Sequence, residues 1–226
     1  GISIEQWLQN RDKNTEMASN DWKTSNPNAD YLGESDNESD NSGIRGVVWL
    51  NVESLSNDAK RQRLSDEVQK KKELNEFKLR FQANVIAEMT GAVVLEMSFI
   101  DMVKQIDTIE QTSHIEFLHY IGHCGSDVYG TKFGTDCIFD DSFITIIQTF
   151  NLKVVSLNAC NTSRLAEKLV NEGGVQFAWG WETPCHIEAA CTVGVKFYKD
   201  YKEKKKTLQE IFDRSKGWHF FKSSFL

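Results

Sequence analysis

The chain is poor in the residues and runs that mark several classes of protein. Its 226 residues include only two prolines, Pro27 and Pro184, which excludes a proline-rich linker protein. No apolar run approaches the ~18 residues of a membrane-spanning helix, so we expect no contact with a membrane. Glycine-rich phosphate loops of the GxGxxG and P-loop types are absent, which argues against a nucleotide-binding function.

Cysteine pairs of the CxxC type are also absent. The five cysteines, Cys124, Cys137, Cys160, Cys185 and Cys191, all lie in the second half of the chain. Because we see no secretory signal either, we expect a reduced, cytoplasmic protein. The net charge of −7 argues against nucleic acid as a direct partner, since phosphate binding needs a concentrated basic face.

Negative charge is concentrated at the start of the chain. Residues 1–43 hold nine acidic and three basic residues, so they carry nearly all of the net charge. The segment 33–43 has no apolar side chain and buries too little surface to offset its ordering entropy. We expect residues 1–43 to be an acidic, Asn- and Ser-rich leader or linker. Its first apolar residues, Ile4, Trp7 and Leu8, fit either a short docking helix or the frayed remnant of a longer chain.

From Gly46 onward, apolar residues recur with the periods of strands and helices in alternation. One helical face is expected from Ile100, Val103, Ile106 and Ile109. The segment 127–139 predicts a hairpin or an ordered loop, and two helices are expected to finish the chain. The expected strands are 46–51, 93–99, 115–121, 153–158 and 175–179, and the expected helices are 60–90, 100–109, 143–150, 162–172, 186–203 and 207–215.

Strands that alternate with helices predict an α/β fold with a largely parallel sheet and helices on both faces. In such a sheet, ligands and reacting groups lie beyond the carboxyl ends of the strands. The third expected strand ends in GHCG at 122–125, and the fourth ends in NAC at 158–160. We therefore expect His123 and Cys160 to emerge side by side at one edge of the sheet.

A thiol beside an imidazole ring has the chemistry of a nucleophilic pair. The thiolate of Cys160 would form an acyl-enzyme, while His123 takes up the thiol proton or protonates the leaving amine. The backbone N–H groups of Cys124 and Cys160 are candidate donors to the developing oxyanion. The helix after Cys160 is expected to lower the pKa of its thiol. A free cysteine alone is more often an inert core residue, but the equivalent strand-end positions of the two residues favour a site.

Two motifs resemble those of a known family. The run HYIGHCG at 119–125, followed by VVSLNAC at 154–160, is similar to the catalytic strands of the caspase-like cysteine peptidases of clan CD, and most of all to their CHAT branch. AWGWE at 178–182 resembles the family's fifth strand and the loop after it. The resemblance extends over about residues 44–217. Cys124 is a departure, because the family usually has glycine after the histidine.

The resemblance implies both a fold and an activity. The fold is a caspase-like, three-layer sandwich over residues 44–226, with a mostly parallel central sheet. The activity is that of a cysteine endopeptidase that cleaves a specific protein substrate through the dyad of His123 and Cys160, with no metal or other cofactor. Such domains are usually regulated modules of signalling or defence systems, so a regulatory protein partner or a fused regulatory domain is expected. The alternative is a catalytically silent member of the fold that acts as a binding or scaffold module.

Four residues near the motifs are candidates for the substrate pocket. Asn158 stands where some relatives that cut after Arg or Lys carry an acid. Glu182 and Asp136 would supply negative charge from loops, and Trp181 would wall the pocket. For each of them a structural role is the alternative, since strand tryptophans usually pack in cores and exposed acids are usually solvated.

Other cysteines and histidines also leave alternatives. Cys185 and Cys191, with a histidine between them, match no zinc-binding spacing, so we expect Cys191 to pack in the core. His119 is expected to be buried and hydrogen-bonded within its strand. Cys124 is a candidate to form a disulfide bond with Cys160 under oxidation.

Overall fold

The computed structural model describes most of the chain after the leader. The described residues are 46–51, 66–127, 130–134, 136–203, 206–215 and 221–225. The leader expected over 1–43 lies outside them, as do the first residues of the helix expected over 60–90. The leader and the helical state of 60–65 remain predictions, whereas the helix itself is confirmed over Asp66–Thr90.

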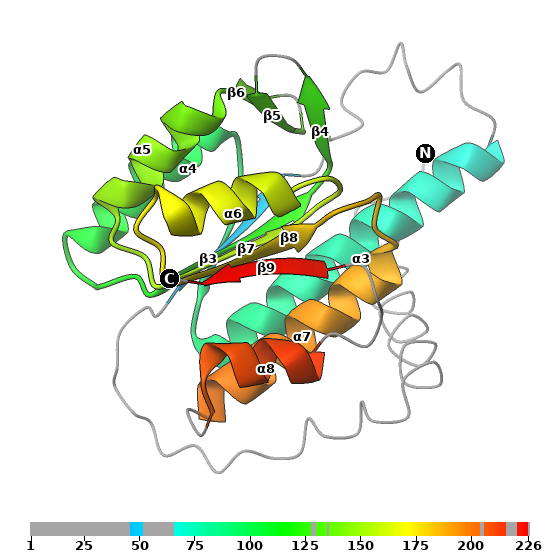
Figure 1. The fold of residues 1–226 in the computed structure, drawn as a ribbon. Helices are drawn as coiled ribbons and strands as arrows, with labels where there is room; N and C mark the ends of the chain where they lie inside the picture. The colour runs from blue at the N-terminus through cyan, green and yellow to red at the C-terminus, as the bar shows by residue number, and fades with distance from the viewer. Residues whose placement is uncertain are drawn as a thin grey trace. The chain divides into compact units, whose positions relative to one another are not determined.

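A six-stranded sheet forms the centre of the fold (Figure 1). Its spatial order is β2-β1-β3-β7-β8-β9; the first five of these strands run parallel, and β9 is antiparallel to β8. The mostly parallel sheet that the sequence predicts is therefore confirmed. The strands are β1 (Gly46–Asn51), β2 (Val93–Glu96), β3 (Phe117–Gly122), β7 (Val154–Asn158), β8 (Phe177–Trp181) and β9 (Phe221–Phe225).

Helices cover both faces of the sheet (Figure 1). This arrangement confirms the predicted three-layer α/β sandwich. None of the described helices combines the length and the apolar character needed to cross a membrane. One face carries α4 (Phe99–Glu110), α5 (Asp140–Thr149) and α6 (Ser163–Asn171), and the other carries α3 (Asp66–Thr90), α7 (Ile187–Glu203) and α8 (Leu208–Ser215).

Two apolar cores lie between the sheet and its helix layers. Successive residues of β3 enter opposite cores: Leu118 and Tyr120 pack towards α4, α5 and α6, and Phe117 and Ile121 pack towards α3, α7 and α8. All four of these side chains are fully buried. Burial on both faces explains why the parallel strands are near-continuous apolar runs rather than alternating ones.

The start of α4 differs from the expectation. The strand predicted over 93–99 ends at Glu96, because Ser98 caps the next helix by accepting a hydrogen bond from the Asp101 N–H. The helix therefore begins at Phe99, and its buried face is formed by Phe99, Met102, Ile106 and Ile109. The expected face was wrong at Ile100, whose side chain is 66% exposed.

The end of the chain is also different. Two helices were expected to finish it, but β9 follows them and pairs with β8. This strand has the sequence FKSSF, and its two central serines give it no clear apolar period. Pairing with β8, rather than local pattern, defines it as a strand.

A second, smaller sheet follows β3. It is antiparallel and three-stranded, with β4 (Cys124–Asp127), β5 (Gly130–Phe133) and β6 (Asp136–Ile138) in spatial order. The hairpin expected within 127–139 is confirmed and belongs to this sheet. The sheet begins one residue after His123, so it is part of the scaffold of the candidate site.

A buried polar network crosses the core beneath the sheet's centre. His119 is fully buried, with Nδ1 in contact with Ser156 Oγ and Nε2 3.5 Å from Gln82 Nε2. Ser156 Oγ in turn lies 3.0 Å from the hydroxyl of Tyr198. A neutral imidazole satisfies these contacts when Nδ1–H donates to Ser156 and Nε2 accepts from Gln82. Burial lowers the pKa of His119 to about 3. The expectation of a buried, hydrogen-bonded histidine is confirmed.

This network predicts a loss of stability in mild acid. In the unfolded chain His119 takes up a proton near its ordinary pKa of 6.5, whereas in the folded protein it stays neutral down to about pH 3. The free energy of unfolding should therefore fall by about 2 kcal/mol between pH 7 and pH 5 because of this one residue. Urea unfolding of the wild type and of His119→Gln at both pH values measures the effect. The variant should show a smaller loss between the two pH values, and an equal loss would contradict the assignment.

Candidate active site

Strand register places His123 and Cys160 at one edge of the sheet. Strands β3 and β7 are parallel neighbours, and Ile121 lies opposite Asn158. His123 and Cys160 each follow two residues later, at equivalent positions beyond the carboxyl ends of their strands. The expected adjacency of the two strands is therefore confirmed. The His123 side chain is exposed, and Cys160 is half-buried.

The backbone of His123 is held from two sides. Its carbonyl oxygen accepts hydrogen bonds from the Tyr120 hydroxyl and from the Gly134 N–H, both at 2.8 Å. Gly134 has a φ of 59°, and a Cβ added there would lie 2.6 Å from Asn51 Oδ1. Glycine is therefore required at this turn, and the turn positions the strand end that carries the histidine.

The His123 ring opens onto a hollow beside α3. The hollow has a volume of about 260 Å³ and continues from His123 along the first turns of that helix. Its walls include the stems of two lysines as well as apolar side chains. Besides His123, the lining residues are Val68, Lys71, Lys72, Asn75, Glu76 and Leu79.

The turn that carries Cys160 is organised by Thr162. Thr162 is fully buried, and its Oγ1 lies 2.9 Å from the carbonyl oxygen of Leu157 and 2.8 Å from that of Ala159. The same oxygen accepts a hydrogen bond of 3.2 Å from the Trp181 N–H. A Cβ at Gly180 would lie only 2.7 Å from Thr162, so β8 approaches the turn closely because this residue is glycine. One hydroxyl thus ties the turn after β7 to β8.

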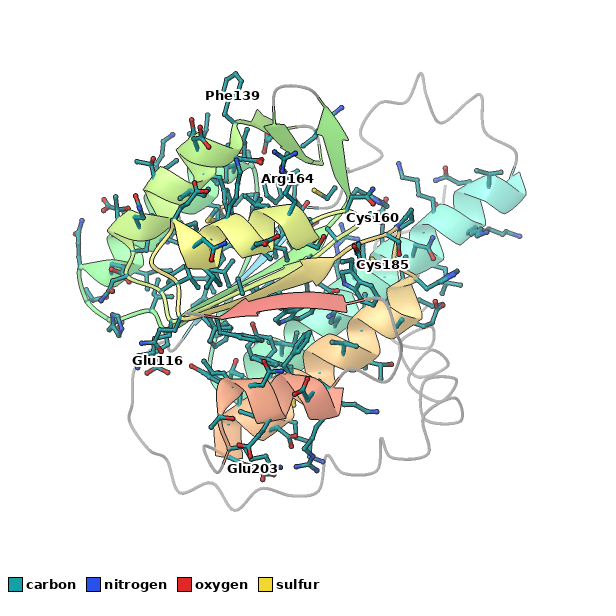
Figure 2. The ribbon with its side chains drawn as sticks, in the orientation of Figure 1. Glu116, Phe139, Cys160, Arg164, Cys185 and Glu203 are labelled. Carbon is teal, nitrogen blue, oxygen red and sulfur yellow. The ribbon has the colours of Figure 1, made fainter. Side chains whose placement is uncertain are left out.

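The sulfur of Cys160 has a partner that the sequence analysis missed. The Cys185 N–H donates to Cys160 Sγ at 3.4 Å, and the two Sγ atoms are 3.9 Å apart (Figure 2). Cys185 lies between β8 and α7. Strand β8 neighbours β7, so the loop after it reaches the same edge of the sheet. The rule that reacting groups lie beyond the carboxyl ends of parallel strands would also have predicted a role for this loop.

These contacts favour the thiolate form of Cys160. Hydrogen bonding from the Cys185 thiol lowers the pKa of Cys160 to about 6, against the opposing effect of burial. The Cys185 N–H and the charge of His123 lower it further. Conversely, the pKa of Cys185 is raised, because its proton is shared with Cys160 and because it is partly buried. Cys160 is therefore the more acidic thiol of the pair.

The two expected oxyanion donors are the backbone N–H groups of Cys124 and Cys160. Cys124 pairs with Phe133 across β4 and β5. The adjacent Gly134 N–H bonds to His123 O, so Cys124 occupies the type of antiparallel position whose N–H points away from the partner strand. Among the described residues, the Cys160 N–H likewise donates to no backbone carbonyl. Both N–H groups therefore lie outside the backbone hydrogen-bond ladders. This geometry is compatible with the oxyanion role that was predicted for them.

Two of the expected pocket residues form a buried pair below the site. Asn158 is 3% exposed; its Nδ2 donates to the carbonyl oxygen of Ala190 at 3.0 Å, and its Oδ1 accepts from Trp181 Nε1 at 2.8 Å. The structure thus brings Asn158 and Trp181 together and gives both of them a role in packing. Contact of either residue with a substrate stays a prediction.

The other two pocket candidates are Asp136 and Glu182. Asp136 is on β6, where its Oδ2 accepts from the Phe99 N–H at 2.8 Å and lies 3.5 Å from Asn51 Nδ2. It thereby joins the small sheet to the start of α4. Glu182 is exposed in the loop directly after β8. Their contact with substrate likewise stays a prediction.

The remaining cysteines have different surroundings. Cys191 is buried on α7 beside Gln82, which confirms the expected core packing. Burial raises the pKa of Cys124 to about 12, with the charge of Cys160 adding to the rise. In the part of the chain that the structure describes, no three His, Cys, Asp or Glu residues are grouped as metal ligands would be.

The Cys160–Cys185 contact predicts a strongly pH-dependent reactivity. Alkylation of Cys160 by iodoacetamide, followed by mass spectrometry, should rise with a midpoint near pH 6. In Cys185→Ala the midpoint should move upward, because the variant loses the donor that stabilises the thiolate most. Cys191→Ala is the matched control and should keep the wild-type midpoint. A midpoint near 9 in the wild type, or no change in Cys185→Ala, would refute this account of the thiolate.

The Thr162 hydroxyl predicts a difference between two conservative variants. Thr162→Val keeps the shape but removes the partner of Ala159 O and Trp181 N, so the free energy of unfolding should fall by about 1–3 kcal/mol. Thr162→Ser keeps the oxygen and should lose less. Urea unfolding of both variants provides the measurement. The proposed role of the hydroxyl fails if Thr162→Ser is as destabilised as Thr162→Val.

No protein-family model matches this chain, and no curated protein matches it. The family resemblance of the two motifs is therefore untested by these comparisons. What defines the site is its own geometry: a half-buried thiol that accepts from the Cys185 N–H and contacts the Cys185 sulfur, at the edge of the sheet where His123 also emerges.

Proposed function

We propose that this chain is a caspase-like cysteine endopeptidase of the CHAT type, with Cys160 as nucleophile and His123 as general acid and base. The observation that carries the proposal is the placement of a thiol with a lowered pKa beyond the end of β7, beside the strand end that carries an exposed histidine. A structural cysteine has no need of either feature, since burial alone raises a thiol pKa.

The two residues have complementary roles in acyl transfer. The Cys160 thiolate attacks the carbonyl carbon of the scissile peptide bond, and the tetrahedral intermediate collapses to an acyl-enzyme when His123 protonates the leaving amine. Water then attacks the acyl-enzyme, with His123 taking up its proton, and the carboxylic acid product leaves with the thiolate restored. Because His123 is exposed next to the hollow along α3, its ring is open to a bound chain.

Stabilisation of the oxyanion is assigned to backbone N–H groups. The Cys124 N–H points away from β5, and the Cys160 N–H lies within the turn that Thr162 organises. Two donors that are already in place before the reaction stabilise the transition state by several kcal/mol in a site of this kind. Cys124 in place of the glycine usual in the family is compatible with this role, since the required atom belongs to the backbone.

Substrate and regulation follow from the same proposal. The substrate is a protein that is cut after one preferred residue, and a regulatory protein or a fused domain controls access to the site. Asn158, Trp181, Glu182 and Asp136 are proposed only as surroundings of the substrate pocket. A non-catalytic scaffold is the competing function, and it requires neither the lowered pKa of Cys160 nor the exposed ring of His123.

An active-site probe separates the enzyme from the scaffold. A peptidyl acyloxymethyl ketone should label wild-type protein at Cys160 and should not label Cys160→Ala. His123→Ala should cut both labelling and cleavage of a peptide library by ~100-fold or more, the usual size of a general acid–base contribution. Cys191→Ala, which removes a buried thiol packed beside Gln82, should behave as the wild type.

Cleavage of a peptide library by Cys160→Ala at the wild-type rate would contradict the proposal. So would labelling of Cys160 that is independent of His123. A folded wild-type protein that binds a partner but is neither labelled nor active on any peptide would favour the scaffold. Circular dichroism of each variant checks that its fold is retained.

A further inference from the structure

Cys185 and Cys160 form a thiol pair at the edge of the sheet. In Figure 2 the two side chains lie together, where the loop after β8 meets the turn after β7. Their sulfur atoms are 3.9 Å apart, and the Cys185 N–H also points at Cys160 Sγ. Both thiols are free and half-buried, so they remain within reach of a small reagent.

We propose that Cys160 and Cys185 form an oxidation site, in which peroxide oxidises Cys160 and Cys185 resolves the product as a reversible disulfide bond. The reacting geometry is already close, since a disulfide needs an S–S distance of about 2.05 Å. Cys185 lies in the segment 182–186, which belongs to neither a strand nor a helix. A small movement of this segment, together with rotation about the side-chain bonds of both cysteines, closes the gap.

The chemistry balances in two steps. The Cys160 thiolate attacks hydrogen peroxide, an S–O bond forms, the O–O bond breaks and hydroxide leaves, so that the sulfur becomes a sulfenic acid. The Cys185 sulfur then attacks this sulfur, the S–S bond forms and the S–O bond breaks. The departing hydroxide takes the proton of the Cys185 thiol and leaves as water. A dithiol reductant reverses the reaction by thiol–disulfide exchange.

The surroundings make the reaction specific to this pair. Of the thiols whose surroundings the structure describes, Cys160 has a lowered pKa, and those of Cys124, Cys185 and Cys191 are raised. The first oxidation therefore falls on Cys160, because peroxide reacts with thiolates. The structure records a sulfur–sulfur contact of Cys160 with Cys185, and none with Cys124 among the described residues. We therefore propose Cys185, in place of Cys124, as the disulfide partner of Cys160.

Two consequences follow for the site. While the disulfide exists, Cys160 is no nucleophile, so under the proposed function the peptidase is reversibly switched off. The disulfide also protects Cys160, because a sulfenic acid with no resolving thiol is oxidised further to irreversible products. Only the first consequence rests on the proposed function; the disulfide itself forms whether or not the chain cleaves peptides.

Peptide mapping of the oxidised protein tests the inference directly. The full chain is treated with equimolar hydrogen peroxide, the remaining thiols are alkylated, and the digest is analysed by mass spectrometry without reduction. The expected result is a crosslinked peptide joining Cys160 to Cys185, lighter than the two thiol peptides by two hydrogen atoms, which disappears after treatment with dithiothreitol. Cys124→Ala, the control for the alternative partner, should give the same crosslink.

Variants of the resolving cysteine make the outcome decisive. Treated with excess hydrogen peroxide, Cys185→Ser should show no crosslink at Cys160 and should accumulate sulfinic acid there, because a second equivalent of peroxide oxidises the unresolved sulfenic acid and dithiothreitol does not reverse that product. A crosslink of Cys160 to Cys124, or reversible oxidation of Cys185→Ser equal to that of the wild type, would overturn the inference. If the crosslink forms while the reduced protein cleaves no peptide, the oxidation site stands and the proposed function fails.

Discussion

The parallel pairing of β3 with β7 is the constraint on which the candidate site depends. Because Ile121 lies opposite Asn158, the next residues of the two strands leave the sheet at the same level. His123 and Cys160 are thereby brought to one edge from positions 37 residues apart in the sequence. A shift of this register by one residue would turn the strand's side chains to the opposite core and separate the two functional groups. The apolar residues of β3 and β7, buried on both faces of the sheet, hold that register.

Hydrogen bonds from neighbouring elements fix the backbone around His123 and Cys160. Tyr120 and Gly134 bind the carbonyl oxygen of His123, and Thr162 ties the turn of Cys160 to β8. The loop after β8 then brings Cys185 to the sulfur of Cys160. The loop after β8 thus contributes the group that does most to lower the pKa of Cys160. The same contact that favours a reactive thiolate also places a second thiol where it can resolve oxidation. The proposed reactivity and the proposed sensitivity to oxidation therefore have one structural cause.

The fold was largely predictable because its periodic segments are long and buried. The five parallel strands and their intervening helices were all expected, and so was the edge at which His123 and Cys160 emerge. Local errors arose where a polar residue overrides the apolar pattern, as at Ser98, which caps α4, or where pairing alone defines a strand, as in β9. The role of Cys185 was missed because it depends on the path of a loop with no periodic pattern. Hydrogen bonds such as that between Asn158 and Trp181 are likewise tertiary contacts that a single sequence does not specify.

The central claim is that Cys160 attacks a carbonyl carbon in a site where backbone N–H groups receive the oxyanion. A crystal structure of the protein with a peptide aldehyde tests it most directly, because the thiohemiacetal resembles the tetrahedral intermediate. The account predicts a covalent bond from Cys160 Sγ to the aldehyde carbon, with the new oxygen about 2.7–3.1 Å from the N atoms of Cys124 and Cys160 and with His123 facing the same centre. Attachment at another cysteine, or an oxygen turned away from both N–H groups, would contradict it.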